Sequence, residues 1–448
     1  MNKKITLKKL SHIQVIALGF LLMITVGTVL LMLPISSRER VFTPFLTALF
    51  TSASASCVTG LVLVDTGTYW SLFGQFVILA LIQQGGLGII TIATMFFSLA
   101  DNNIGLRKRA IMAESINTTH IAGLKGLTRR IVLGTLLFEG VGAVLLSIRF
   151  IPDFGVFKGI WFSVFHSISA FCNAGFDVLG ETGHYCSFVN YSDDLLVNVT
   201  LMALITIGGA GFLVWSDLRA NGFRWRRYQL HTKLVLCVSA FLTFGGALLF
   251  WLMERGGVLA GLSAKEQILD SLFSSVTCRT AGMNTVEISD LGTPSKLLMS
   301  FLMFVGGSSG STAGGVKTTT LAVALIYMCA GLRGIHNPAV FGRTISGETA
   351  KKAMCVMMIN FLLAFGGTIA ISAVQELPAL DVIYETSSAM GTVGLTAGIT
   401  RDLNTLSRLI IIFLMFCGRV GSTSFALALF EKRAEPPVTY PVEDISVG

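Results

Sequence analysis

The sequence predicts an all-α polytopic membrane protein. We expect four helix–pore loop–helix (M1–P–M2) repeats around a pseudo-four-fold axis, with eight transmembrane helices and four re-entrant pore helices. Composition is the first reason: the 448 residues are 53% hydrophobic and 13% charged, whereas a soluble domain has about a quarter of its residues charged. The second reason is the spacing of four glycines in similar settings, which lie about a quarter of the chain apart: Gly60, Gly175, Gly282 and Gly394. Self-similarity at a fixed period indicates a repeat architecture.

Each repeat contains two long apolar runs that flank a short one. The long runs reach or approach the roughly 20 residues that cross a bilayer, and the short ones do not. The predicted elements, in order, are 13–33, 44–56 and 73–99; 131–150, 158–171 and 195–215; 234–253, 265–277 and 296–327; and 353–374, 381–390 and 406–430. Irregular backbone after each short segment is tolerated at membrane depth only inside protein or along a wet cavity. Surface amphipathic helices are the alternative for the short segments, but the four-fold recurrence disfavours them.

The repeats give the domain organisation. We expect repeat 1 at 1–110, repeat 2 at 111–225, repeat 3 at 226–335, repeat 4 at 336–430 and a cytoplasmic tail at 431–448. The first run follows a Lys-rich start, but it is too long for a signal peptide and lacks a small-x-small cleavage site. Lys and Arg concentrate in the N-terminus, the alternate loops and the tail, which places both termini in the cytoplasm.

Charge and cysteine usage exclude other classes. The net charge of +8 comes from the Lys and Arg residues that set the orientation in the membrane. The sequence has no basic soluble face of the kind that binds nucleic acid, so nucleic-acid binding is not expected. The eight cysteines form no CxxC pair, so a disulfide framework or a metal site is not expected. No strand–GxGxxG–helix unit and no convergent catalytic cluster is present, so we predict neither a nucleotide-binding domain nor an enzyme.

The four glycines end four short polar cores. A ring of backbone carbonyls can replace the hydration shell of an ion, and glycine lets the backbone turn without a Cβ penalty. The first and last cores nearly match the K⁺-channel filter sequence. The cores are Cys57-Val58-Thr59-Gly60, Cys172-Asn173-Ala174-Gly175, Arg279-Thr280-Ala281-Gly282 and Gly391-Thr392-Val393-Gly394. Any one glycine alone would be read as an ordinary turn.

The chain resembles the ion-translocating subunits of the Trk/Ktr/HKT superfamily, and most closely the KtrB-type subunits of bacterial K⁺ uptake systems. The resemblance is most specific in four stretches: 50–61, 166–176, 279–284 and 391–396. The resemblance implies K⁺ permeation through these four cores, with the ion held by filter carbonyls only. Family members with Ser at the first filter glycine admit Na⁺, so Gly60 implies K⁺ preference. Cys57 and Cys172 stand where we expect polar residues, which bears on selectivity details.

The resemblance also implies partners and surroundings. It implies a homodimer with one pore per protomer, in the bacterial cell membrane and in contact with lipid. A cytoplasmic ring of RCK-type nucleotide-binding subunits would dock on the basic inside loops and the tail 431–448. Nucleotide would act only through that ring, no cofactor would be tightly bound, K⁺ would be the transported ion, and Na⁺ is a candidate activator.

A Gly/Ser tract interrupts the second long run of repeat 3. Each glycine costs a helix about 1 kcal/mol relative to Ala, so the tract should unwind. Close helix packing is one alternative. A phosphate loop is another, since Lys317-Thr318 follows the tract, but Val316 intrudes and no strand precedes it. The resemblance favours an intramembrane gate loop formed by Gly306, Gly307, Ser308, Ser309, Gly310, Ser311, Thr312, Ala313, Gly314 and Gly315, with Lys317 following.

Arg419 lies inside the last apolar run, and an intramembrane Arg is a functional candidate by default. In the family a matching Arg faces the gate loop. An ion pair with a buried acid is the alternative, with Glu139 as the candidate acid. Lys317 has the alternative of snorkelling to the inner interface. We interpret His166 as a packed histidine, because no metal-ligand spacing surrounds it.

The predicted function is K⁺ translocation through a carbonyl-lined filter that an intramembrane loop gates. A Na⁺-coupled or less selective monovalent cation symporter is the alternative. Symporters of this kind are built from inverted repeats with broken helices. The four repeats of this chain are predicted to have the same orientation in the membrane, which disfavours the symporter.

Overall fold

The computed structural model describes residues 12–88 and 124–421. Across these residues the chain is helical, and its only strands are the short hairpin β1 (Ala339–Val340) and β2 (Arg343–Thr344). The predicted tail 431–448 and the C-terminal ends of two predicted runs, 89–99 and 422–430, lie outside the described residues. The prediction of a mostly helical protein with several long apolar helices is confirmed.

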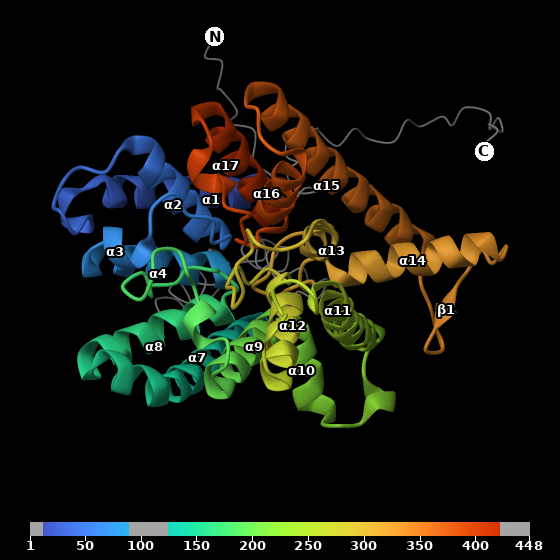
Figure 1. Cartoon of the computed structure of the whole chain (residues 1–448). Coiled ribbons are helices and arrows are strands. Elements are labelled where there is room, and N and C mark those ends of the chain that lie inside the picture. The colour runs from blue at the N-terminus through green and yellow to red at the C-terminus, as the bar shows by residue number, and fades with distance from the viewer. Residues whose placement is uncertain (1–11, 89–123, 422–448) are drawn as a thin grey trace, which may run out of the picture.

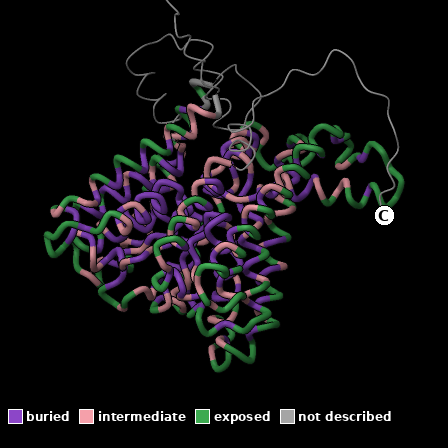
Figure 2. Tube along the Cα trace, turned by 90° about the horizontal axis from the view of Figure 1, so that it is seen from above, coloured by how far each residue is buried: buried purple, intermediate pink, exposed green. Residues whose placement is uncertain are grey.

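Among residues 12–88 and 124–421, four single helices are long and apolar enough to cross a membrane. They are α1 (His12–Met32), α7 (Leu124–Phe154), α11 (Leu230–Glu254) and α15 (Gly347–Val374). Each exposes large apolar side chains along its outer face, for example Leu22, Leu137, Phe241 and Leu362. A membrane helix presents such a face to lipid, and the exposed residues run along the outer rim of the molecule while buried ones fill its interior (Figure 2).

A shorter helix follows each long one. These are α2 (Phe45–Cys57), α8 (Val156–Phe171), α12 (Ala264–Thr277) and α16 (Ala379–Gly391), and their C-terminal halves are buried. Their starts follow local rules. Ser263 and Glu266 form a capping box at α12, and Pro44 and Pro378 precede α2 and α16 as N-cap residues.

Each long helix, the shorter helix after it and the helices that follow form one of four helix groups, numbered in chain order. The third element of each group is also helical. α4 (Leu72–Leu87) and α17 (Thr405–Val420) are single helices in the described residues, whereas α9 (Leu195–Ala210) is followed by α10 (Phe212–Asn221), and α13 (Thr293–Phe304) by α14 (Thr318–Leu332). The break between α13 and α14 falls in the Gly/Ser tract. The expectation of one continuous helix over 195–215 is wrong, because α9 and α10 meet at an angle of 93°. Gly211 between them has a φ of +97°, which lies outside the helical range and is open to glycine.

Short helices connect these groups. They are α3 (Thr66–Tyr69) and the 3-10 turns η1 (Pro34–Ser36), η2 (Val189–Tyr191), η3 (Trp225–Arg227) and η4 (Ile399–Asp402).

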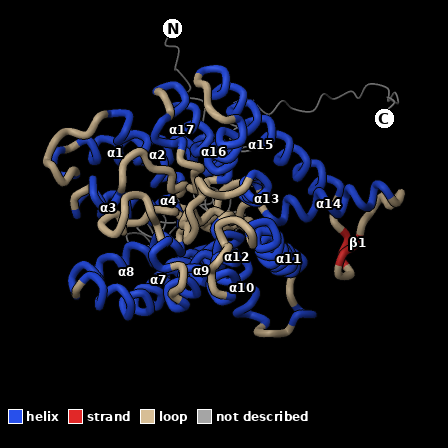
Figure 3. The backbone as a smooth tube through the Cα atoms, viewed as in Figure 1, coloured by secondary structure: helices blue, strands red, loops and turns tan. Residues whose placement is uncertain are grey.

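Contacts between groups close a circle. α4 packs against α8, α9 against α12, α13 against α16, and α17 returns to pack against α2. The helices therefore surround a central region where the loops gather (Figures 1 and 3). α14 and the β1–β2 hairpin extend away from this body.

Candidate functional site

The loops that follow the four short helices share one backbone conformation. Each contains a left-handed residue, then an ordinary one, then a left-handed glycine. The glycines Gly60, Gly175, Gly282 and Gly394 have φ values of +94°, +71°, +76° and +98°. Two residues before them, Val58, Asn173, Thr280 and Thr392 have φ values of +57°, +59°, +70° and +51°. Non-glycine residues adopt positive φ rarely, so its recurrence at four matching positions indicates one structural task.

The amides of these loops point back to the preceding helix. In the first loop the Thr59 amide donates to the Ser54 carbonyl at 2.8 Å, and the Gly60 amide donates to Ser54 Oγ at 3.0 Å. The fourth loop repeats the arrangement on Ser388, with the same two distances. Since the donors are used behind the loop, its carbonyl oxygens remain for the opposite side.

The four glycines meet in chain order. A Cβ on Gly60 would lie 2.6 Å from the Ala174 carbonyl oxygen, and one on Gly175 would lie 3.0 Å from that of Ala281. In the same way Gly282 lies against the Val393 carbonyl, and Gly394 against that of Thr59. The loops thus close into a ring in which the carbonyl before each glycine approaches the preceding glycine, and no side chain fits at these positions.

Several polar side-chain atoms of the ring have no partner. Thr59 Oγ1, Thr392 Oγ1 and Asn173 Oδ1 are buried without a hydrogen-bond partner among the described residues. The Asn173 amide nitrogen instead donates to Thr280 Oγ1 at 3.1 Å and to the Arg279 carbonyl at 3.2 Å. The Asn173 side chain thus ties the second loop to the third.

Three side chains of the predicted cores turn elsewhere. Arg279 donates to the carbonyl and hydroxyl oxygens of Ser239 on α11, both at 3.1 Å. Cys57 is fully buried. Cys172 Sγ lies 3.5 Å from Gln83 Oε1 and 3.8 Å from Glu139 Oε1. The side chains of Arg279 and Cys172 therefore point to neighbouring helices.

A vestibule of about 150 Å³ opens above the ring. All four glycines line it, together with the acids Asp65, Asp177 and Glu287 and the cation Arg401. The Arg401 guanidinium lies 4.1 Å from the centre of the Tyr185 ring, and the Tyr185 amide donates to Asp65 Oδ2 at 3.1 Å. The acidic excess favours cations at this mouth.

Among the three acids that line the vestibule, Asp177 has a pKa near neutrality. Burial, and then the nearby Asp65 carboxylate, raise the pKa of Asp177 to about 7. Both effects disfavour its charged form. The charge at the mouth therefore changes near neutral pH.

The Gly/Ser tract forms a loop on the other side of the ring. Val305 and Val316 pair as a parallel bridge at its two ends. Thr312 Oγ1 donates to the Phe171 carbonyl at 3.2 Å, just before the second filter core. A Cβ on Gly315 would lie 3.2 Å from Gly391 Cα, beside the fourth core. The loop therefore lies directly under the ring.

The bend between α9 and α10 also holds the loop. The Ser308 amide donates to the Gly209 carbonyl at 3.0 Å, and the Phe212 amide donates to the Gly310 carbonyl at 2.7 Å. The end of one helix and the start of the next thus find their partners in the loop. A phosphate loop follows a strand, whereas the element before this tract is the helix α13. The structure therefore contradicts the phosphate-loop alternative.

Arg419 joins the loop to the first helix group. Its guanidinium donates to the carbonyl oxygens of Thr312, Gly85 and Gly86, the last at 3.0 Å. In the part of the chain that the structure describes, Arg419 forms no ion pair. Glu139 does not meet it: Glu139 Oε2 accepts from Gln83 Nε2 at 3.2 Å. The arrangement favours the loop-facing reading over the ion-pair alternative.

Lys317 and His166 both contact backbone groups of the central loops. Lys317 does not snorkel away, because its ammonium group turns back to the carbonyls of Ala313 and Gly314 at 2.6 and 3.2 Å. His166 is buried: Nδ1 lies 2.7 Å from the Phe162 carbonyl, and Nε2 accepts from the Val178 amide at 3.1 Å. His166 thus supports the second of the four loops, and the described residues hold no group of His, Cys, Asp and Glu that could bind a metal.

Sequence reasoning missed a second four-fold motif. Gly85-Gly86-Leu87-Gly88, Gly208-Gly209-Ala210-Gly211 and Gly418-Arg419-Val420-Gly421 end α4, α9 and α17, and Gly306-Gly307 follows α13. A Cβ on the first glycine of the first, second and fourth copies would strike the carbonyl of Ser56, Phe171 or Met390, the residue just before each filter core. These glycines let the helix approach the ring of loops, and Arg419 occupies the place of the second glycine in the fourth copy.

Comparison with known proteins assigns the family. The family model "TrkH: Cation transport protein" matches residues 3–435. This chain belongs to the TrkH family. It is 40% identical to the "Potassium/sodium uptake protein NtpJ" of Enterococcus hirae, covering 100% of this chain and 99% of that protein. It is 38% identical to the "Ktr system potassium uptake protein B" of Bacillus subtilis, covering 97% and 96%.

A solved structure agrees with the fold. The potassium transporter TrkH from Vibrio parahaemolyticus superposes with a TM-score of 0.74 at 18% identity, covering 96% of this chain and 87% of that one. The family model and the relatives from E. hirae and B. subtilis confirm the resemblance to the Trk and Ktr transporters, and the solved structure shows the same fold. As a TrkH-family cation transporter with several apolar helices, this is a multi-pass membrane protein.

Proposed function

We propose that this chain is the K⁺-translocating subunit of a K⁺ uptake system. The closed ring of four glycines and their neighbouring carbonyls carries the proposal, because a dehydrated K⁺ needs several oxygen ligands without a fixed charge that would trap it. The names of the relatives from E. hirae and B. subtilis both include potassium uptake. K⁺ is the cargo, transport involves no catalytic step, and no cofactor is required within the chain.

The filter consists of the four cores 57–60, 172–175, 279–282 and 391–394. Each belongs to one M1–P–M2 repeat, within 1–110, 111–225, 226–335 and 336–430, which gives eight transmembrane and four pore helices. The circular packing of α4, α9, α13 and α17 on the next short helix supports this arrangement. The vestibule is external, and both termini are cytoplasmic.

The gate consists of residues 306–315 with Lys317 and Arg419. Two cationic side chains beside the pathway would oppose K⁺, and the loop fills the space under the ring. Opening would require Arg419 to release the Thr312 carbonyl, or the loop to leave the bend of α9 and α10.

The protein would act as a homodimer under a cytoplasmic ring of RCK-type nucleotide-binding subunits. The phrase "Ktr system" in the name of the B. subtilis relative supports a multi-component assembly. Na⁺ remains a candidate activator.

A Na⁺-coupled or less selective cation symporter is the second candidate. The name of the E. hirae relative includes sodium as well as potassium, and broken helices beside a central site occur in symporters. Uptake of K⁺, Rb⁺ and Na⁺ by a K⁺-uptake-deficient host separates the two. Saturable K⁺ and Rb⁺ uptake without Na⁺ accumulation is expected, whereas obligatory Na⁺ accumulation alongside K⁺ would support the symporter.

Replacing Gly60 by Ser is expected to reduce the preference for K⁺ over Na⁺ about ten-fold, equivalent to roughly 1.4 kcal/mol. Gly60 has a φ of +94°, and its Cβ would displace the Ala174 carbonyl from the ring. The measurement is competitive uptake of Rb⁺ against Na⁺. Gly261→Ser is the matched control, because Gly261 has a φ of +80° with open space around it. Equal selectivity in the two variants would contradict the filter assignment.

Replacing Asp177 by Asn is expected to flatten the pH dependence of uptake. Because the pKa of Asp177 is raised to about 7, its carboxylate appears at the mouth as the external pH rises from 6 to 8. Uptake at subsaturating K⁺ should rise roughly two- to five-fold over that interval in the wild type. The variant should lose most of this rise, whereas Glu287→Gln should retain it. An unchanged pH step in Asp177→Asn would assign the step to another group.

A further inference from the structure

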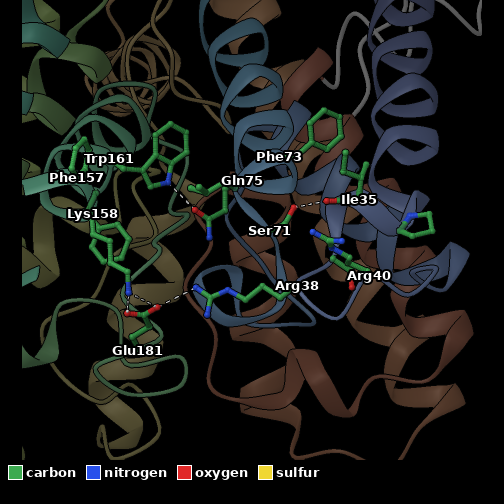
Figure 4. A pocket seen from close by; sticks show the side chains of 14 residues that line it. Ile35, Arg38, Arg40, Ser71, Phe73, Gln75, Phe157, Lys158, Trp161 and Glu181 are labelled. Atoms are coloured by element: carbon green, nitrogen blue, oxygen red, sulfur yellow. Dashed lines mark hydrogen bonds and ion pairs between the residues drawn. The ribbon is translucent and has the colours of Figure 1, made fainter.

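A second cavity lies away from the pathway. It is a groove of about 1070 Å³ between the first and second helix groups, at the N-terminal ends of α4 and α8 (Figure 4). These ends lie at the level of the vestibule, because the loop after the second filter core contributes Glu181 to the groove and Tyr185 to the vestibule. The groove takes no part in the ring or the gate.

Basic side chains surround one part of the groove. Arg38, Arg40 and Lys158 line it, with Glu181 as the one acid. Glu181 accepts from Arg38 at 3.1 Å and from Lys158 at 3.0 Å, and hydrogen bonding from Lys158 lowers the pKa of Glu181. The carboxylate therefore stays ionised, and three cations against one anion leave an excess of positive charge.

The three cations can all reach an additional ligand. The Arg38 and Lys158 side chains remain 46% and 59% exposed despite their ion pairs with Glu181. Arg40 is exposed and has no acidic partner among the described residues. Its φ of +55° belongs to the tight turn that follows η1, where its amide donates to the Ser37 carbonyl.

The rest of the groove is apolar. Leu72, Phe73 and Phe157 line it and are exposed, Phe157 by 93%. Trp161 Nε1 donates to Gln75 Oε1 at 2.8 Å (Figure 4), and Gln75 Nε2 donates to the Trp70 carbonyl at 3.2 Å, so the side-chain polar atoms of both residues have partners. Trp161 therefore presents its ring to the groove. Aromatic residues beside basic ones are typical of the level where membrane headgroups meet acyl chains.

We propose that this groove binds one anionic phospholipid from the leaflet on the vestibule side. Its phosphate would contact Arg40 and Lys158, and its acyl chains would cover Phe73 and Phe157. A free phosphate would leave the apolar wall in water. A zwitterionic lipid would add its own cation to a site that already has an excess of positive charge, so a headgroup with net negative charge fits best.

The test counts bound lipid on the full-length protein by native mass spectrometry. The probes are phosphatidylglycerol and phosphatidylcholine with identical acyl chains, and the variants are Arg40→Gln, Lys158→Gln and the double variant. We expect the wild type to retain phosphatidylglycerol preferentially. Each removed cation should weaken its binding about five-fold, and the double variant about 25-fold.

Two controls isolate the site. Lys351→Gln removes a lysine from α15 that is 79% exposed and pairs only with the equally exposed Glu348, and it should leave phosphatidylglycerol binding unchanged. Phe157→Ser removes an acyl contact, so it should weaken both lipids to a similar extent. Unchanged thermal unfolding of lipid-free protein would show that each variant folds.

Several outcomes would overturn the proposal. Equal retention of the two lipids would mean unspecific contact with the bilayer, and an equal loss in Lys351→Gln would mean a general charge effect. Displacement of lipid by millimolar inorganic phosphate would identify a free-anion site. A change from dimer to monomer in the double variant, with lipid binding unaffected, would assign the groove to a second copy of the chain.

Discussion

Deletion of residues 310–314 is expected to raise K⁺ flux through the isolated subunit at least ten-fold. These residues include Thr312, whose side chain reaches the Phe171 carbonyl and whose own carbonyl accepts from Arg419. The deletion removes both links and empties the space directly under the ring. A ten-fold rise corresponds to a barrier lower by about 1.4 kcal/mol. Flux should be measured in proteoliposomes with and without the regulatory partner.

The controls for the deletion separate obstruction from general damage. Thr312→Ala keeps the backbone and the Arg419 acceptor but loses the hydroxyl contact, so it should raise flux much less. The paired valines at the ends of the loop remain in the deleted protein, and its selectivity for K⁺ should persist because the ring is intact. A stably inserted deletion variant with the same flux as wild type would refute the gate.

Replacement of Arg419 by Gln is expected to raise the resting flux by about ten-fold or more while preserving K⁺ preference. At an effective dielectric constant of about 20, two unit charges 4 Å apart repel by about 4 kcal/mol, and by about half as much at twice that distance. The substitution also removes donors that bind the carbonyls of Thr312, Gly85 and Gly86. The substitution therefore removes at once the positive charge and the hydrogen bonds that hold the loop, which we call the latch.

Arg419→Lys distinguishes these two contributions. Lysine keeps the positive charge but cannot span three carbonyls with a planar group of donors. If the latch dominates, the Lys variant should conduct like the Gln variant; if the charge dominates, it should resemble wild type. Thermal stability must be measured on the same preparations. A marked loss of stability with no gain in flux would leave Arg419 a purely structural role.

Much of the fold could be predicted from the sequence because membrane insertion imposes simple rules. Length and apolarity identified the long helices, and the spacing of Gly60, Gly175, Gly282 and Gly394 anticipated that the four loops meet. Backbone conformation was predictable at these positions, since a left-handed ring position admits glycine far more easily than other residues.

Contacts between distant side chains were not predictable in the same way. The sequence offered Glu139 as a partner for Arg419, but nothing local indicates that α7 directs this acid to Gln83 instead. The bend at Gly211 was missed because hydropathy continues through it. Comparing the four helix ends with one another would have found it, since the same glycine pattern recurs at 85–88, 208–211 and 418–421.

Arg419 occupies a position where the other helix groups have Gly86, Gly209 and Gly307. In a pore assembled from four identical chains, an arginine at this position would appear four times, and four like charges would crowd one axis. A single chain that repeats itself escapes this constraint, because each quarter can diverge alone. Here the fourth quarter carries the cation and the third carries the Gly/Ser loop, while the first supplies the carbonyls of Gly85 and Gly86 and the second supplies the bend that binds the loop. A regulator then needs to act on only one side of the channel to change the whole of it.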